Sequence, residues 1–226
     1  MRPAAIGLLV ASLLVLGACG GQGAAIDWVD FIQWKGITYL AVPPASAGTT
    51  TPVLGAQLAT TKRQLADNET NPAYRIKDGD AGYLKAGTPI YALRDYRSSF
   101  RIGVKGTSGT VMYEADTNPN AATGADLLDL DNKVIGIGIG GPDSTTELAS
   151  IQDPAAIIRL VRITLQAPVD EAIQPAGTQY FVAFHFRDGT ESVRAFWPSM
   201  GLLQRGIIAG PEFARIILSA VPSPAA

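Results

Sequence analysis

Cysteine and histidine are nearly absent from this chain. Its 226 residues contain one of each, Cys19 and His185. One cysteine cannot form a disulfide within the chain, and one histidine cannot supply a histidine cluster for a metal. A serine–histidine triad would have to use His185, yet the sequence has no G-x-S-x-G motif. His185 lies in an alternating aromatic run, and this pattern predicts an ordinary strand residue.

An excess of positive charge is also missing. The chain has 18 Lys and Arg against 20 Asp and Glu, for a formal net charge of -2. This mildly acidic balance gives no electrostatic case for binding nucleic acid. Glycine and proline, in contrast, are plentiful, at 24 and 15 residues. Their spread along the chain indicates many turns and short strands rather than a helical bundle.

Long apolar runs are missing, apart from one at the N-terminus. Met1-Arg2-Pro3 supplies a positive charge, and the segment Ala4–Leu16 that follows is almost entirely apolar. The segment is shorter than the roughly 20 residues that span a membrane. A charged start followed by a short apolar run is typical of a secretory signal.

The next residues, Leu16-Gly17-Ala18-Cys19, resemble the lipobox of bacterial lipoproteins. The resemblance implies that residues 1–18 are a signal peptide and that the Cys19 thiol carries lipid. Two or three acyl chains make a stable anchor, because each buried methylene contributes about 0.8 kcal/mol. The resemblance also implies a place in the bacterial cell envelope, lipid-anchored on the extracytoplasmic side of a membrane. The alternative is an ordinary cleaved signal with an incidental cysteine.

Strand patterns dominate the first part of the mature chain. Residues 19–25 form a short lipidated tether, and a β-rich region is expected over 26–145. Two β-rich runs around Lys35-Gly36 predict a hairpin. A strand is expected at Val53–Thr60, followed by a surface connection without a clear period. Four short strands then predict a meander or small barrel, at 88–93, 99–104, 110–114 and 133–139.

Helical patterns enter the second part, an α+β region expected over 150–220. Asp153 is a good N-cap, and apolar residues then recur at helical spacing until Pro168. A hairpin is expected around Asp188-Gly189, and a last helix at Pro211. The predicted fold class is therefore α+β: an N-terminal β-rich meander or small barrel, followed by a helix–β-hairpin–helix segment. The two regions are either separate domains or share one core.

Gly136–Gly141 has the spacing of the dinucleotide-binding motif G-x-G-x-x-G. That motif needs its glycines between a strand and a helix. Here the isoleucines that alternate with the glycines predict that the segment is itself a strand. We therefore expect no nucleotide, and no cofactor of any kind is predicted.

Asp116, Asn118 and Asn120 place oxygen-bearing side chains at every second position, which makes them a candidate Ca²⁺ site. The Ca²⁺-binding loop pattern is not completed, because Ala121 and Leu127 stand where it needs glycine and glutamate. The alternative is a turn held by local hydrogen bonds from Asn and Asp side chains. This alternative is favoured, so no metal is predicted.

The densest group of basic and aromatic residues contains Tyr96, Arg97, Phe100 and Arg101. Exposed aromatic rings with arginine make good contact surfaces for an envelope protein, a peptide or a glycan. These four residues are the candidate binding residues. The favoured alternative is a loop with solvated arginines, in which Tyr91 and Phe100 pack inward.

The sequence favours a lipid-anchored, non-enzymatic binding or accessory module of the cell envelope. Its partners would be the membrane, through the lipid on Cys19, and an envelope protein, peptide or glycan; no nucleic acid is expected. One alternative is an envelope hydrolase that uses carboxylates, which two carboxylates roughly 5–10 Å apart in a cleft would support. Another is a structural envelope protein.

Overall fold

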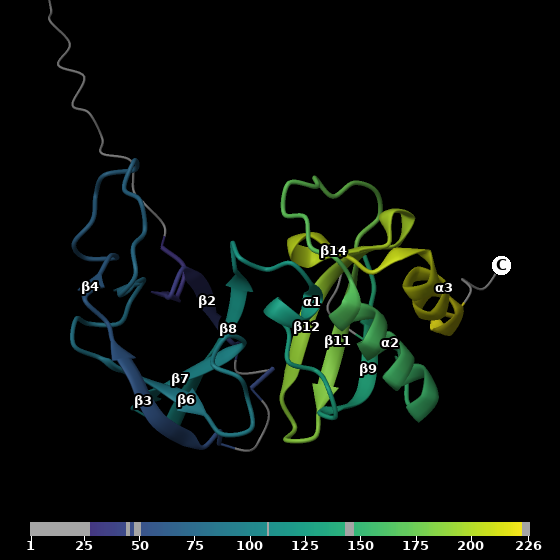
Figure 1. The fold of residues 1–226 in the computed structure, drawn as a ribbon, viewed down its shortest axis with the longest axis horizontal. Helices are drawn as coiled ribbons and strands as arrows, with labels where there is room; N and C mark the ends of the chain where they lie inside the picture. The colour runs from purple at the N-terminus through teal and green to yellow at the C-terminus, as the bar shows by residue number, and fades with distance from the viewer. Residues whose placement is uncertain (1–27, 44–45, 48–50, 108, 143–146, 223–226) are drawn as a thin grey trace, which may run out of the picture.

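The computed structural model describes residues 28–43, 46–47, 51–107, 109–142 and 147–222. Within these ranges, three α-helices accompany two β-sheets, so the fold is α+β. We call the parts built around the sheets the N-terminal lobe (described residues of 28–117) and the C-terminal lobe (described residues of 118–222). Figure 1 shows the lobes side by side, with α2 and α3 on the C-terminal lobe. None of the helices in the described ranges is long and apolar enough to cross a membrane.

The N-terminal lobe is an eight-stranded sheet that curls back on itself. Its strand order is β3-β6-β7-β8-β2-β1-β5-β4. The edge strands β3 and β4 are separated in the chain only by Thr61 and Lys62. The backbone N–H of Thr61 donates to the carbonyl of Thr88, next to β6, and that of Lys62 donates to the carbonyl of Gly79, next to β5. These two residues therefore link the two edges of the sheet. The strands are β1 (Phe31–Trp34), β2 (Ile37–Ala41), β3 (Leu54–Thr60), β4 (Arg63–Gln64), β5 (Asp80–Ala81), β6 (Pro89–Leu93), β7 (Arg101–Gly106) and β8 (Gly109–Thr117).

Local sequence explains the hairpins of this lobe. Lys35 and Gly36 both have positive φ, 52° and 75°, as a two-residue turn between twisted strands requires. Strands β6, β7 and β8 form a meander, because each pairs antiparallel with the next. The buried side chains of the curled sheet form one apolar cluster that includes Ile32, Tyr39, Ile90, Ile102, Val104 and Tyr113.

The C-terminal lobe is a six-stranded antiparallel sheet with helices packed on one face. Its strand order is β10-β9-β11-β12-β13-β14. Asp153 caps α2 by accepting a hydrogen bond from the backbone N–H of Ala156 at 2.8 Å. The elements are α1 (Gly124–Leu127), β9 (Val134–Gly140), β10 (Glu147–Ile151), α2 (Pro154–Gln166), β11 (Tyr180–Phe186), β12 (Glu191–Trp197), η1 (Pro198–Met200), β13 (Leu202–Leu203), η2 (Gln204–Gly206), β14 (Ile207–Ile208) and α3 (Gly210–Ala220).

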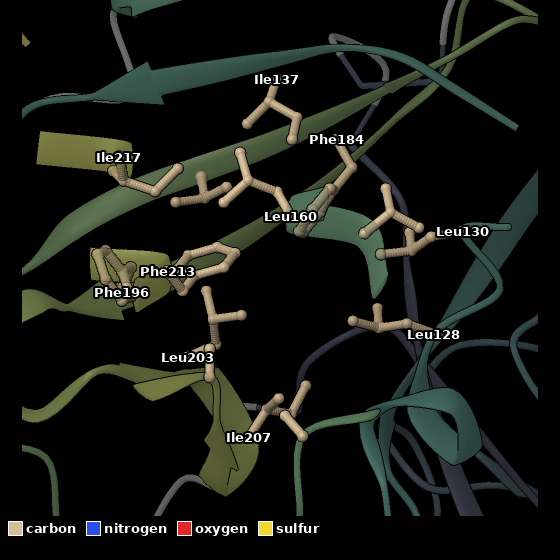
Figure 2. Close-up of a cluster of buried hydrophobic side chains, with 14 of the residues drawn as sticks. Leu128, Leu130, Ile137, Leu160, Phe184, Phe196, Leu203, Ile207, Phe213 and Ile217 are labelled. Atoms are coloured by element: carbon tan, nitrogen blue, oxygen red, sulfur yellow. The ribbon is translucent and has the colours of Figure 1, made fainter. Parts of the chain in front are cut away.

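The core of the C-terminal lobe lies between the sheet and its helices. Figure 2 shows Phe184 of β11 next to Leu160 of α2, both fully buried. Phe213 of α3 packs edge-to-face on Phe196 of β12, with ring centroids 5.2 Å apart. Phe100, which comes from the N-terminal lobe, belongs to the same buried cluster. The hydrophobic core of this lobe therefore continues into the junction with the other lobe.

The structure confirms most of the expected elements and corrects one pairing. The hairpins around Lys35-Gly36 and Asp188-Gly189, and the helices that begin near Asp153 and Pro211, are all present. The strand expected over 133–139 is also present, as β9, but it is not the fourth strand of the N-terminal meander. It pairs with β10 and β11 in the second sheet. The chain therefore changes sheets between β8 and β9, earlier than residues 145–150.

Candidate functional site

Arg101, one of the predicted binding residues, lies buried between the two lobes. Its side chain is 0% exposed. The guanidinium donates to Oε2 of Glu114 from Nε at 2.8 Å and from Nη2 at 2.6 Å. It also donates to Thr190 Oγ1 and to the carbonyl of Glu191, both at 2.8 Å. Because Arg101 starts β7 and its other partners lie at the start of β12, this one side chain joins the two sheets.

Aromatic rings surround the same guanidinium. Its central carbon lies 4.8 Å from the ring centroids of Tyr96 and Phe100, and 4.5 Å from that of Phe186. The Tyr96 hydroxyl donates to Asp188 Oδ2 at 2.7 Å, and burial raises the pKa of this tyrosine. Cation–π attraction is stronger at a desolvated site, so the rings stabilise the buried charge. The basic and aromatic residues therefore come together as expected, but Tyr96 and Phe100 pack around Arg101 instead of forming an exposed contact surface.

Glu114 of β8 completes this inter-lobe network. While Oε2 accepts from Arg101, Oε1 accepts from Arg194 Nη2 at 2.7 Å and from Ser192 Oγ at 2.6 Å. Both arginines and the glutamate are buried. Buried charges are tolerated when they are paired and hydrogen-bonded, as these are.

The geometry decides which candidate binding residues are accessible. Phe100 and Arg101 are 0% exposed, so they cannot form part of an exposed contact surface. The side chain of Arg97 is 50% exposed, but its Nη2 donates to the carbonyls of Ala125 and Leu128, each at 2.7 Å. Tyr96 is partly exposed. A role in partner contact therefore remains a prediction for Tyr96 and Arg97. Phe100 and Arg101 instead hold the two lobes together, Phe100 through the buried apolar cluster and Arg101 through its hydrogen bonds.

The side-chain oxygen atoms of two of the three candidate Ca²⁺ residues, Asp116 and Asn118, accept hydrogen bonds within the chain. Both carboxylate oxygens of Asp116 accept hydrogen bonds from Arg205. Asn118 accepts from the backbone N–H of Asn120 at 3.1 Å and donates to the carbonyl of Asp126 at 3.3 Å. The backbone N–H of Thr123 lowers the pKa of Asp126, whose carboxylate closes the first turn of α1. Among the described residues, no group of three or more His, Cys, Asp or Glu could hold a metal ion. Cys19 lies outside the described residues.

A different hollow lies on the open face of the second sheet. Along β9, Ile137 and Ile139 are buried in the helix-covered core, so the alternate residues Gly136, Gly138 and Gly140 face the other way. Because glycines have no side chains, this face is recessed. A cavity of about 390 Å³ opens above it. Its lining is mostly apolar, and includes Pro43, Gly138, Gly140, Phe181, Ala183 and Val193. We call this cavity the glycine cleft.

His185, with Glu147 and Glu191, stands at the edge of the glycine cleft. His185 Nε2 lies 3.2 Å from Oε2 of Glu147, and Nδ1 lies 3.4 Å from Oε2 of Glu191. The hydroxyl of Ser46 donates to the other carboxylate oxygen of Glu191 at 2.8 Å. A Cβ at Gly138 would come within 2.4 Å of the Glu147 carboxylate and 2.7 Å of His185 Nε2. This glycine therefore allows the two side chains to meet.

This arrangement was not predicted from the sequence, although the proximity of His185 and Glu191 could have been found from it. His185 and Glu191 are cross-strand partners in the hairpin that Asp188-Gly189 predicts. Counting outward from that turn places the two side chains on one face. Glu147 gave no such signal, because β10 is a short edge strand whose pairing with β9 depends on the tertiary fold.

The polar groups of the glycine cleft are mainly hydrogen-bond acceptors with negative charge. Glu147 and Glu191 line it and present carboxylate oxygens, and their side chains are 46% and 26% exposed. The rest of its lining is largely aliphatic. Such a hollow suits a group with a short apolar stem and a positively charged or hydrogen-bond-donating end. Comparisons with protein-family models, with curated proteins and with solved structures found no match to this chain.

Proposed function

We propose that this chain is a non-enzymatic binding or accessory module of the bacterial cell envelope, anchored through lipid on Cys19 at the extracytoplasmic side of a membrane. The lipobox-like Leu16–Cys19 segment supports the anchor. The glycine cleft supports the binding role, and it is the observation that carries the proposal. Its ligand would be a basic group of an envelope peptide, protein or glycan.

Two features of the glycine cleft favour such a ligand. First, Glu147 and Glu191 share one neighbour, His185, so two carboxylates face a single ring that carries at most one positive charge. An entering ammonium group would add a charge where acceptors are in excess. Second, the apolar floor around Gly138, Ala183 and Val193 matches the methylene stem of a lysine side chain.

The binding test uses Nα-acetyl-lysine methylamide as the probe and its norleucine counterpart, which lacks the charge, as the comparison. Calorimetric titration of the chain should detect the lysine compound alone. We expect Glu147→Gln and Glu191→Gln each to weaken its binding about tenfold, since each removes a charged hydrogen-bond acceptor. Glu212→Gln, at a glutamate on α3 whose side chain is 43% exposed, is the matched control. Equal binding of both compounds would contradict the proposal.

A paired glycine substitution tests the location of the site. Gly136 and Gly138 point to the same face of β9, but Gly138 alone lines the cleft. Gly138→Ala should reduce binding strongly, because its Cβ would separate Glu147 from His185. Gly136→Ala should not, because its Cβ would meet the end of the flexible Gln152 side chain at 3.0 Å. If Tyr96→Ala and Arg97→Ala weaken binding while Gly138→Ala does not, the site lies at the junction of the lobes.

Carboxylate-dependent hydrolysis is the second candidate, because Glu147 and Glu191 line one cavity. In that case the chain would release products from envelope glycans or peptides, and Glu147→Gln or Glu191→Gln would abolish the release. Chromatography of wall fragments incubated with the chain measures this. Product formation that both substitutions remove would replace the binding proposal.

The anchor has a test of its own. Cells grown with a labelled fatty acid should incorporate the label into the wild-type protein and not into Cys19→Ala. Equal labelling of the two would contradict lipid attachment at this residue.

A further inference from the structure

A second cavity lies along one flank of α2, between the helix and the start of β9. It has a volume of about 650 Å³, within the usual range for small-molecule sites. One wall is α2, and the other is the start of β9 together with residues 130–132 and Arg187. We call this cavity the α2 groove. It shares no lining residue with the glycine cleft, so a ligand bound here is separate from the one proposed above.

Aliphatic side chains line the α2 groove and remain uncovered. Ile158 of α2 is 58% exposed, and Ile135 of β9 is 51% exposed. Val161 and Leu165 line the groove beneath them. Scattered exposed aliphatic residues are ordinary, but here they meet in one concavity. Covering them with an apolar group would be favourable.

Two arginines line the same groove without partners. Arg162 and Arg187 are exposed, and their side chains make no hydrogen bond or ion pair within the described part of the chain. Arg159, one helical turn before Arg162, is in contrast paired with Glu212. The groove has one acidic lining residue, Asp131, which accepts a hydrogen bond from Asn132. Two arginines and one aspartate therefore give the groove a net positive charge.

The pairing of β9 limits what can occupy the groove. β11 pairs with this strand from Val134 to Gly140, and β10 pairs with it from Ile137 to Gly140, so only residues 134–136 keep an open edge for an added peptide strand. The remaining polar lining consists of amide side chains, at Asn132, Gln152 and Gln166. An aliphatic chain needs no backbone hydrogen bonds, and its anionic end would meet arginine, which binds carboxylate and phosphate in a forked geometry. We propose that the α2 groove binds a single aliphatic chain that ends in an anionic group, as in a fatty acid or an anionic lipid.

The test titrates dodecanoate into the whole chain carrying Cys19→Ala, so that no acyl group on Cys19 can enter the groove. Dodecylamine, with the same aliphatic chain and opposite charge, is the comparison probe. Dodecanoate should bind more tightly than dodecylamine. Arg162→Gln and Arg187→Gln should each weaken dodecanoate binding about tenfold, because each removes one charged donor. Arg215→Gln, at an exposed arginine on α3, should leave it unchanged.

Further arms separate the apolar contribution and the source of the ligand. Ile158→Ser should weaken dodecanoate binding without lowering the thermal midpoint, since this side chain is exposed. Phosphatidylglycerol vesicles, compared with phosphatidylcholine vesicles, test a membrane source against free fatty acid; retention on the first kind alone supports a lipid headgroup. The proposal is overturned if dodecanoate and dodecylamine bind equally, if both arginine variants bind like wild type, or if neither dodecanoate nor phosphatidylglycerol binds.

Discussion

At the scale of single residues, Arg101 joins the two lobes through its hydrogen bonds. A guanidinium with no exposed area is tolerated because Glu114, Thr190 and a backbone carbonyl accept its hydrogen bonds and three rings surround it. Two of its partners come from the opposite lobe. Replacement of Arg101 therefore removes contacts between the lobes as well as a charge pair.

We expect Arg101→Met to lower the free energy of unfolding by about 3 kcal/mol, because Glu114 loses one of its two buried arginine partners. Chemical denaturation followed by fluorescence measures the change. Arg159→Met is the control, since it breaks an ion pair whose side chains are 58% and 43% exposed, and we expect a loss below about 1 kcal/mol. Similar losses in the two variants would contradict the role assigned to Arg101.

At the scale of elements, α2 packs on the core with one side and borders the α2 groove along the adjacent flank. Ile157, Leu160 and Thr164 are buried, whereas Ile158 and Arg162 are exposed. The helix starts where Asp153 accepts the N–H of Ala156 and where Pro154 needs no hydrogen bond of its own. Its position over β9 therefore depends on both its local start signal and its apolar stripe.

Loss of the α2 cap should loosen the start of the helix. Asp153→Ala should lower the free energy of unfolding by about 1 kcal/mol, and Asp153→Ser, which can still accept the N–H of Ala156, should lower it by less. Hydrogen exchange of the amides in the first turn of α2 provides a local readout. Faster exchange throughout α3 with no change in α2 would contradict this assignment.

At the scale of the whole molecule, charged and polar groups join the lobes. Besides Arg101, the junction contains Asp188, which accepts hydrogen bonds from Tyr96 and Thr190. Burial would raise the pKa of Asp188, but these hydrogen bonds and the charge of Arg101 outweigh it, so the pKa lies below its ordinary value. A carboxyl with a lowered pKa in the folded state stabilises that state above its unfolded pKa, about 3.9.

Protonation of the Asp188 carboxylate at low pH should therefore weaken the contacts between the lobes. The contribution of Asp188 is complete at neutral pH, begins to fall near pH 5, and is lost as the pH drops through the lowered pKa of the folded state. We expect the free energy of unfolding to fall less steeply below about pH 5 in Asp188→Asn than in the wild type. Denaturant titrations between pH 7 and pH 2.5 measure the slopes, and parallel curves would be the contrary result.

Features that depend on residues close together in the sequence could be predicted from it. The turns at Lys35-Gly36 and Asp188-Gly189, the start of α2 at Asp153, and the strand expected over 133–139 follow from local backbone preferences, and the structure contains all four. The two-residue strands β13 and β14 were missed because such short elements have no period to detect. The lipid on Cys19 stays a prediction.

Long-range contacts decided the rest. The sequence determined by itself that β9 is a strand and that basic and aromatic residues gather near Arg101, because periodicity and composition are local properties. Only the tertiary structure decided that β9 joins the second sheet, and that Glu147 meets His185 over a glycine. It also decided that Arg101 faces Glu114 and Thr190 instead of solvent. The physical reason is that burial and charge pairing depend on which distant residues the fold brings together.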